Sequence, residues 1–175
     1  MKELAHNNSS VQGNGKIVFF GIPAHGHTNP TLGVVRELVN RGHNVLYYSY
    51  EPFREKIEDT GAVFIPCETY CEGQSMEAET LSKAGRDMTF LFKMIKETAL
   101  AIEPKLCREM DVLKPDCIVA DSMAVWGKAV ALKLNIPFFV MHSIFCKMIT
   151  IQIQSYILQQ NFSHMRIRFQ KSMNL

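Results

Sequence analysis

Five short apolar runs, rich in β-branched and aromatic residues, alternate along the chain with stretches whose apolar residues recur at helical spacing. Such runs are typical of strands buried on both faces, and the intervening spacing is typical of amphipathic helices. The predicted strands lie in 16–22, 43–50, 62–67, 114–123 and 136–143, and the predicted helices in 29–42, 51–61, 88–113 and 124–135. This alternation predicts an α/β fold with a doubly wound, mostly parallel sheet.

The first predicted strand, helix and second strand follow one another with short joints. Asn29 is a residue type that caps helices and Pro30 is favoured at the first helical position, so we predict that the helix begins there. Gly42 can end this helix. A β-α-β unit of this kind places its two strands in parallel.

Other segments depart from the regular alternation. Residues 67–87 are polar, irregular and rich in Glu and Ser, which predicts a surface excursion of the kind that often forms a binding loop. Within the long helical stretch, Pro104 predicts a kink or a new start. We therefore predict a flexible leader over 1–15, one Rossmann-like domain over 16–146 and a basic tail over 147–175.

Composition narrows the class of protein only a little. A hydrophobic share of 47% and a net charge of +2 are ordinary for a soluble domain and do not favour nucleic-acid binding. No transmembrane stretch or secretory signal is recognisable, which predicts a cytoplasmic location. The 5 cysteines are scattered, and the Cys67–Cys71 spacing lacks a second zinc-like pair, so we expect isolated reduced thiols and no metal.

Candidate chemistry gathers at the end of the first strand, where "GIPAHGHTNP" places His25 and His27 on either side of one glycine. In open parallel sheets, ligands bind beyond the carboxyl ends of the strands. An imidazole there can accept a proton from a hydroxyl if a carboxylate orients the ring. Asp121 ends the fourth strand, which neighbours the first in the usual strand order, so a pair between one of these histidines and Asp121 is plausible.

Three stretches together carry a family resemblance: "GIPAHGHTNPTLGVVRELVNRGHNVLYY", "FREKIEDTGAVFIP" and "KPDCIVADSMAVWGKAVALKLNIPFF". Over residues 16–146 the chain resembles the N-terminal half of family 1 glycosyltransferases, and most of all the bacterial macrolide type that uses UDP-sugars. The combination of H-G-H-x-N-P, R-G-H and P-D-x-x-x-x-D is specific. The resemblance implies an incomplete acceptor-binding domain, the first half of a two-domain GT-B-type fold.

The resemblance also implies roles for individual residues. His27 corresponds to the general base that deprotonates the acceptor hydroxyl and Asp121 to its partner, with inversion at the anomeric carbon. The expected acceptor-binding residues are His25, Asn29, Phe90 and His142, although His25 could instead only hold the turn. We expect no cofactor. The UDP-sugar is a co-substrate whose binding domain is absent from this sequence, so the chain alone is expected to be inactive.

Alternative interpretations of the pocket and of the C-terminal stretch stay open at this point. The preserved pocket could belong to a non-catalytic module that binds a hydrophobic small molecule or a partner, and exposed apolar surface could drive self-association. Residues 122–175 contain 6 Lys or Arg and no Asp or Glu. The Gln-rich end of this stretch, 150–175, could be a basic amphipathic helix that contacts a membrane or a partner, or it could be the altered or truncated end of a longer chain. A dinucleotide-binding Rossmann domain is disfavoured because the first turn carries two imidazoles in place of G-x-G-x-x-G.

Overall fold

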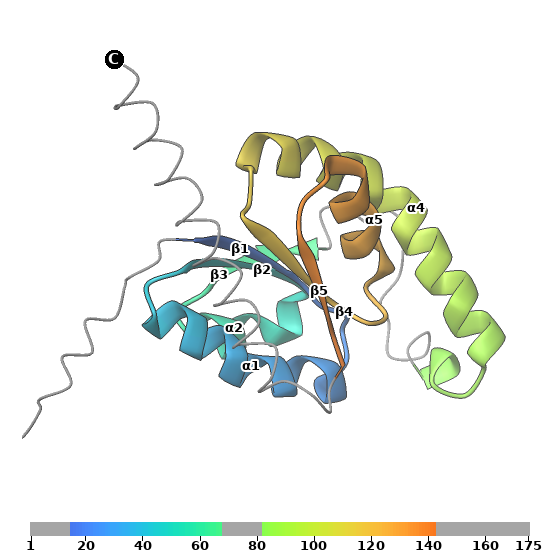
Figure 1. Ribbon diagram of the computed structural model, residues 1–175. Coiled ribbons are helices and arrows are strands. Elements are labelled where there is room, and N and C mark those ends of the chain that lie inside the picture. Colours follow the sequence, from blue (N-terminus) through green and yellow to red (C-terminus); the bar gives the residue numbers. More distant parts are fainter. Residues whose placement is uncertain (1–14, 68–81, 143–175) are drawn as a thin grey trace, which may run out of the picture.

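The computed structural model describes residues 15–67 and 82–142 (Figure 1). The elements in chain order are β1 (Lys16–Phe20), α1 (His25–Asn40), β2 (Asn44–Ser49), the 3-10 helix η1 (Glu51–Phe53), α2 (Arg54–Glu58), β3 (Val63–Pro66), α4 (Met88–Leu113), β4 (Cys117–Asp121), α5 (Val125–Leu134) and β5 (Phe138–Met141). The predicted tail, nearly all of the leader and most of the predicted excursion lie outside the described residues.

The strands form one parallel sheet in the order β3-β2-β1-β4-β5. Helices α1 and α2 cover one face, and α4 and α5 cover the other (Figure 1). This confirms the predicted doubly wound α/β fold, including the expected placement of the fourth strand beside the first. The strand order reverses direction between β1 and β4, which is where ligands bind in open sheets of this class.

The core lies on both faces of the three central strands. β4 is buried over its full length, and all of β1 beyond Lys16 is buried. Aromatic rings from β1 and β2 pack side by side, with Phe19 and Tyr47 stacked at a centroid distance of 5.5 Å. Burying this apolar surface is the main stabilising contribution, at roughly 25 cal/mol per Å². The site described below therefore lies at the end of the two most completely buried strands of the sheet.

Helix α1 begins earlier than the sequence predicts. Its first residue is His25, Ala24 precedes it without a side-chain cap, and Pro30 lies inside the helix. The backbone supplies the start, because the N–H groups of His27 and Thr28 donate to the Ala24 carbonyl at 3.0 and 2.9 Å. The prediction that Asn29 caps this helix is therefore wrong, and both histidines lie in the first turn.

Two other predicted helix features have different outcomes. Gly42 has a φ of 86°, the left-handed conformation that often follows a helix end, and α1 stops just before it. The predicted new start at Pro104 is wrong, because α4 runs from Met88 to Leu113 with this proline inside it. Figure 1 shows the last turns of α4 running in a different direction from its first turns.

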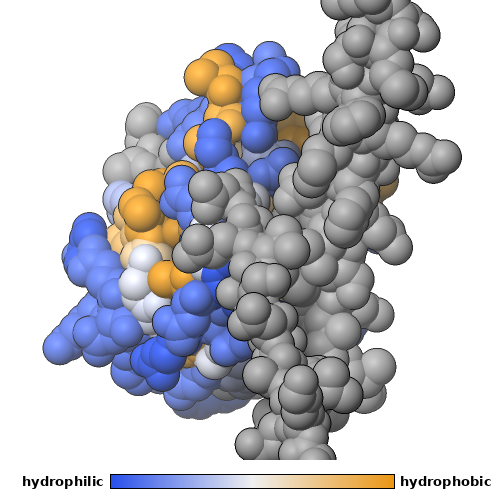
Figure 2. Space-filling model, turned by 60° about the vertical axis from the view of Figure 1, so that its left-hand side comes forward, coloured by the Kyte–Doolittle hydropathy of each residue, from blue (hydrophilic) through white to orange (hydrophobic). Residues whose placement is uncertain are grey.

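The surface of the described part carries separate apolar residues. On α4 these include Phe92, Leu100 and Val112, and Figure 2 shows hydrophobic patches between hydrophilic ones on one face. Scattered residues of this kind are normal for folded proteins, and self-association stays a prediction. No helix within 15–67 and 82–142 is long and apolar enough to span a membrane. The same ranges contain no group of three or more His, Cys, Asp or Glu placed to hold a metal ion.

Candidate functional site

The site lies at the carboxyl edge of the two central strands. β1 and β4 are paired in register, with Phe20 opposite Ala120, so the residues that follow them emerge at the same edge of the sheet. Asp121 is the last residue of β4. After β1, a turn of four residues leads into α1, whose third residue is His27. The early start of α1 thus brings the imidazole over the end of β4.

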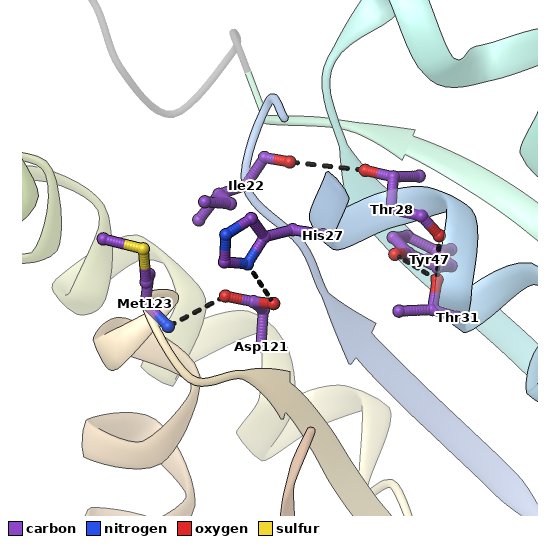
Figure 3. A network of polar contacts seen from close by, with 7 residues as sticks. All are labelled: Ile22, His27, Thr28, Thr31, Tyr47, Asp121 and Met123. Carbon is purple, nitrogen blue, oxygen red and sulfur yellow. Dashed lines mark hydrogen bonds and ion pairs between the residues drawn. The ribbon is translucent and has the colours of Figure 1, made fainter. Parts of the chain in front are cut away.

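His27 and Asp121 form a direct hydrogen bond, with Nδ1 and Oδ2 2.8 Å apart (Figure 3). The Asp121 side chain is 4% exposed, whereas the His27 side chain is 31% exposed. The other carboxylate oxygen, Oδ1, accepts the Met123 backbone N–H at 2.8 Å. Since each carboxylate oxygen has a donor, Asp121 is held in one orientation and in turn fixes the imidazole ring.

This bond determines which ring nitrogen can act. A carboxylate only accepts hydrogen bonds, so Nδ1 of His27 carries the proton and, in the neutral ring, Nε2 has the free lone pair. Figure 3 shows the second ring nitrogen directed away from Asp121, toward the space between Ile22 and Met123. An imidazole in this tautomer can take a proton from a hydroxyl, and the carboxylate stabilises the imidazolium that forms.

A cavity of about 390 Å³ opens beside the pair. Its walls come from the turn after β1, from α4 with the residues before it, and from the start of α5. The lining residues are Ile22, Pro23, Ala24, His27, Tyr50, Ala84, Gly85, Leu91, Met94, Ile95, Thr98, Met123 and Trp126. Apart from His27, this described lining contains no His, Asp, Glu, Lys or Arg. It is an apolar pocket with one proton acceptor on its wall, which suits an uncharged ligand.

The four other predicted site residues are not in this lining. His25 is exposed, and its ring packs edge-on against Phe53 at 4.9 Å. Asn29 and His142 are exposed, and the half-buried Phe90 ring lies beneath the Lys83 ammonium at 4.5 Å. The structure therefore unites His27 with Asp121 and leaves these four outside the cavity. Their part in acceptor binding stays a prediction.

Sequence reasoning left out most of the cavity wall. Leu91, Met94, Ile95 and Thr98 lie on one face of α4 at helical spacing. That spacing is the only sequence signal they give, and it is the same signal that core residues give. Trp126 is 2% exposed and lines the cavity. Which residues of α4 form the wall follows from how this helix packs over the strand ends.

A second cluster of ionisable groups lies away from the cavity, between α4 and α5. Lys133 Nζ is 2.6 Å from Glu103 Oε1, and the Cys107 thiol donates to the same oxygen at 3.1 Å. The Lys133 hydrogen bond lowers the pKa of Glu103. Burial and, after it, the neighbouring Glu103 raise the pKa of the Cys107 thiol to about 11. A protonated thiol is a poor nucleophile, which argues against Cys107 as a catalytic residue.

Comparison with known proteins gives a consistent family. No family model matches the chain. It is 35% identical over 124 residues to the NDP-glycosyltransferase YjiC of Bacillus licheniformis, which covers 71% of this chain and 31% of the relative. It is 31% identical over 123 residues to the oleandomycin glycosyltransferase of Streptomyces antibioticus, covering 69% of this chain and 27% of the relative.

Solved structures agree with these sequence matches. The glycosyltransferase of kitacinnamycin aligns with a TM-score of 0.56 and 25% identity over 72% of this chain and 29% of its own. The glycosyltransferase SnogD from Streptomyces nogalater aligns with a TM-score of 0.57 over 73% of this chain and 33% of its own; at 19% identity it supports the fold alone. The chain spans about 30% of the curated relatives it matches. In sequence and in fold, the chain is similar to the N-terminal part of bacterial glycosyltransferases, among them one that is named for the macrolide oleandomycin.

Proposed function

We propose that this chain is the acceptor-binding part of an inverting, nucleotide-sugar-dependent glycosyltransferase, with His27 as the general base and Asp121 as its partner. The observation that carries the proposal is the 2.8 Å His27–Asp121 hydrogen bond on the wall of an apolar cavity. Relatives such as YjiC and the oleandomycin enzyme are named as glycosyltransferases, which supports the same reaction class.

The proposed step balances without any cofactor. The acceptor hydroxyl oxygen attacks the anomeric carbon of the sugar while its proton passes to Nε2 of His27. The bond between that carbon and the nucleotide phosphate breaks, and the nucleoside diphosphate leaves with the electron pair. Attack opposite to the leaving group inverts the configuration. An alcohol is a weak nucleophile until its proton is removed, so a positioned base contributes about 10² to 10⁴ in rate.

The cavity favours a neutral, largely apolar acceptor. Apart from His27, its described walls are aliphatic, aromatic and thioether side chains, with Tyr50 and Thr98 as the other polar exceptions. An anionic acceptor would lose its hydration there without gaining a charged partner. Two methionines, Met94 and Met123, lie in the wall, and their flexible side chains can adapt to acceptors of different outline. Phenolic or macrolide compounds with a single reactive hydroxyl fit this description.

We infer that the sugar donor binds elsewhere. A diphosphate carries at least two negative charges and is usually held by cations, and no Lys or Arg stands among the described lining residues of the cavity. The matched relatives are about three times as long as the matched region. We therefore propose that the 175-residue chain does not transfer sugar until a donor domain is supplied. The scattered cysteines favour the reducing environment of the cytoplasm.

The test is a turnover assay with UDP-glucose and 2-naphthol, a neutral phenol. Four samples are compared: the chain alone, the chain mixed with the separately expressed donor domain of a full-length relative, the same mixture carrying His27→Ala, and the full-length relative. We expect product in the second and fourth samples only. Product from the chain alone would refute the need for a donor domain, and equal product with His27→Ala would refute the proposed base.

A second candidate function is ligand binding without catalysis. It is favoured by one observation, that described residues of this chain alone suffice to form a cavity of about 390 Å³. Calorimetry with 2-naphthol and with 6-hydroxy-2-naphthoate, its carboxylate derivative, tests this function directly. Binding of the neutral compound combined with no transfer in any mixture would favour the binding module. An absence of heat with both compounds would argue against it.

A further inference from the structure

The first turn of α1, residues 25–28, is weakly held by the helix itself. Its N-cap is Ala24, whose side chain has no acceptor for the free N–H groups, and no acidic residue lies in the turn. Pro30 has no N–H, so the carbonyl of Gly26 lacks the hydrogen bond that residue 30 normally donates. The turn that carries His27 therefore needs support from outside the helix backbone.

That support comes from hydroxyl groups on the side of the turn facing away from Asp121 (Figure 3). Thr31 Oγ1 lies 2.7 Å from the carbonyl oxygen of Thr28, the residue after His27. Thr31 Oγ1 also lies 2.8 Å from the hydroxyl oxygen of Tyr47 on β2. Thr31 and Tyr47 are both buried, so water does not compete for these bonds.

The direction of the hydrogen bonds follows from counting protons. A carbonyl only accepts, so Thr31 donates its one hydroxyl proton to Thr28. The remaining contact must then be donated by Tyr47, and the chain runs from the Tyr47 hydroxyl through Thr31 to the Thr28 carbonyl. Hydrogen bonds linked in this way strengthen one another in a low-dielectric interior.

Tyr47 itself has little freedom to move. Its ring stacks on Phe19 of β1 at 5.5 Å. On another side it lies against Gly21, where an added Cβ would come within 3.0 Å of the ring carbon Cε1. Gly21, the residue after β1, thus leaves room for the Tyr47 ring. Tyr47 is held on the sheet and anchors the start of α1 through its hydrogen bond to Thr31.

We propose that Tyr47, acting through Thr31, is a positioning residue that keeps the His27 ring within hydrogen-bond distance of Asp121. The proposal rests on the proposed function for its catalytic meaning, but its structural content can be measured without turnover. Without the Tyr47 hydroxyl, Thr31 keeps its bond to Thr28 and loses its anchor on β2. The turn then moves more, and the His27–Asp121 hydrogen bond opens more often.

The test is nuclear magnetic resonance of the complete chain with ¹⁵N-labelled histidine. The Nδ1–H signal of His27 is assigned by its loss in His27→Ala, and its exchange rate with water is measured at 25 °C. We expect Tyr47→Phe to raise the exchange rate about fivefold, because the free energy of one net hydrogen bond corresponds to a change of about that size. The matched control is Tyr48→Phe, which removes the neighbouring hydroxyl that bonds Glu109 at 2.6 Å. It is expected to change the rate by less than about twofold.

Two Thr31 variants separate positioning from general loss of stability. Thr31→Val keeps the shape and removes the hydroxyl, so it reproduces the faster exchange, whereas Thr31→Ser keeps the hydroxyl and the wild-type rate. Equal exchange in Tyr47→Phe and Tyr48→Phe, or faster exchange in Thr31→Ser than in Thr31→Val, would overturn the proposal. If the expected exchange pattern appears but no donor domain gives transfer, the proposed function fails while the positioning role stands.

Discussion

Two side-chain pairs, each made of a carboxylate and a basic group, join separate elements of this molecule, and the two pairs differ in their surroundings. His27 and Asp121 meet at 2.8 Å where β1 and β4 end, with the carboxylate side chain 4% exposed. Lys133 and Glu103 meet at 2.6 Å between α5 and α4, with the ammonium side chain 65% exposed. The shorter pair is the one whose residues do not line the cavity described above.

The comparison shows that contact distance alone does not identify a functional site. Lys133 is open to solvent, where an ion pair is screened and contributes little. Asp121 is buried and accepts a backbone N–H with its second oxygen, and His27 is the only His, Asp, Glu, Lys or Arg in the described cavity wall. The fixed tautomer and the adjacent apolar cavity make the first pair suited to proton transfer, whereas Lys133 has no tautomer to fix and neither Lys133 nor Glu103 lines that cavity.

The largest expected effect comes from His27→Ala. With a donor domain supplied, transfer to 2-naphthol is expected to fall by about 10² to 10⁴, because no other group in the described wall can take the proton. Lys133→Ala is the matched change in the second pair and is expected to leave the rate within about twofold. Initial rates, with urea unfolding curves to confirm folding, check both. Similar losses in the two variants would remove the distinction between the pairs.

Asp121→Asn is expected to have the next largest effect. The amide oxygen can keep the Met123 N–H bond, which turns the NH₂ group toward His27. Nδ1 of the ring must then accept, so the proton moves to Nε2, which can no longer take one from the acceptor. We expect a loss on the order of 10²-fold in rate. Unchanged histidine ¹⁵N shifts in this variant would contradict the tautomer argument.

The fold and the pair could be predicted because strong, short-range signals encode them. Each strand is a short apolar run, and the alternation with helices leaves few topologies, so Asp121 could be placed beside the first strand. The start of α1 could not be predicted in the same way. Asn29 and Pro30 match the preferred residues of a helix start, but the backbone of Ala24 begins the helix earlier. A local preference was overridden by the fit of the turn to the sheet.

The cavity wall was harder to predict for a different reason. Leu91, Met94 and Ile95 have the spacing of a helix face that packs on a core. Whether that face fills space or leaves a cavity depends on how α4 lies across the strand ends, which is a long-range property. Polar residues near the motif, such as Asn29, were better candidates by chemistry, yet Asn29 points to solvent from α1.

A third prediction concerns α5, which connects the two pairs. Its Gly127 faces the sheet, where an added Cβ would lie 2.7 Å from Phe20 Cδ2 and 2.8 Å from the Ala120 Cβ. Gly127→Ala is therefore expected to lower the free energy of unfolding by about 1–3 kcal/mol. Gly33→Ala, in α1 with nothing within 4 Å, is expected to raise it by about 0.5–1 kcal/mol. Urea unfolding measures both, and equal signs would contradict the packing argument.

The smallest expected effect tests the second pair through its neighbour Cys107. Burial is the main reason that the pKa of this thiol is raised to about 11, and the Glu103 carboxylate raises it further, whereas Lys133 lowers it. At pH 8.5 the thiol is almost fully protonated. Glu103→Gln lowers the pKa of Cys107 and so increases the thiolate fraction and the rate of alkylation by iodoacetamide. The increase is limited to a few-fold because burial remains.

Lys133→Ala should act in the opposite direction on the same cysteine. Removing the ammonium raises the pKa of Cys107 and slows its alkylation. Cys117, whose thiol is buried with a pKa raised to about 12, serves as the internal control in the same mass-spectrometric measurement. Slower labelling of Cys107 in Glu103→Gln would mean that the carboxylate does not act on the thiol by charge. We expect the alkylation rate of Cys107 to change in opposite directions in Glu103→Gln and Lys133→Ala, with sugar transfer unchanged in both. That result would show that the Lys133–Glu103 pair affects only the pKa of its neighbour, in contrast to the proposed proton transfer at His27 and Asp121.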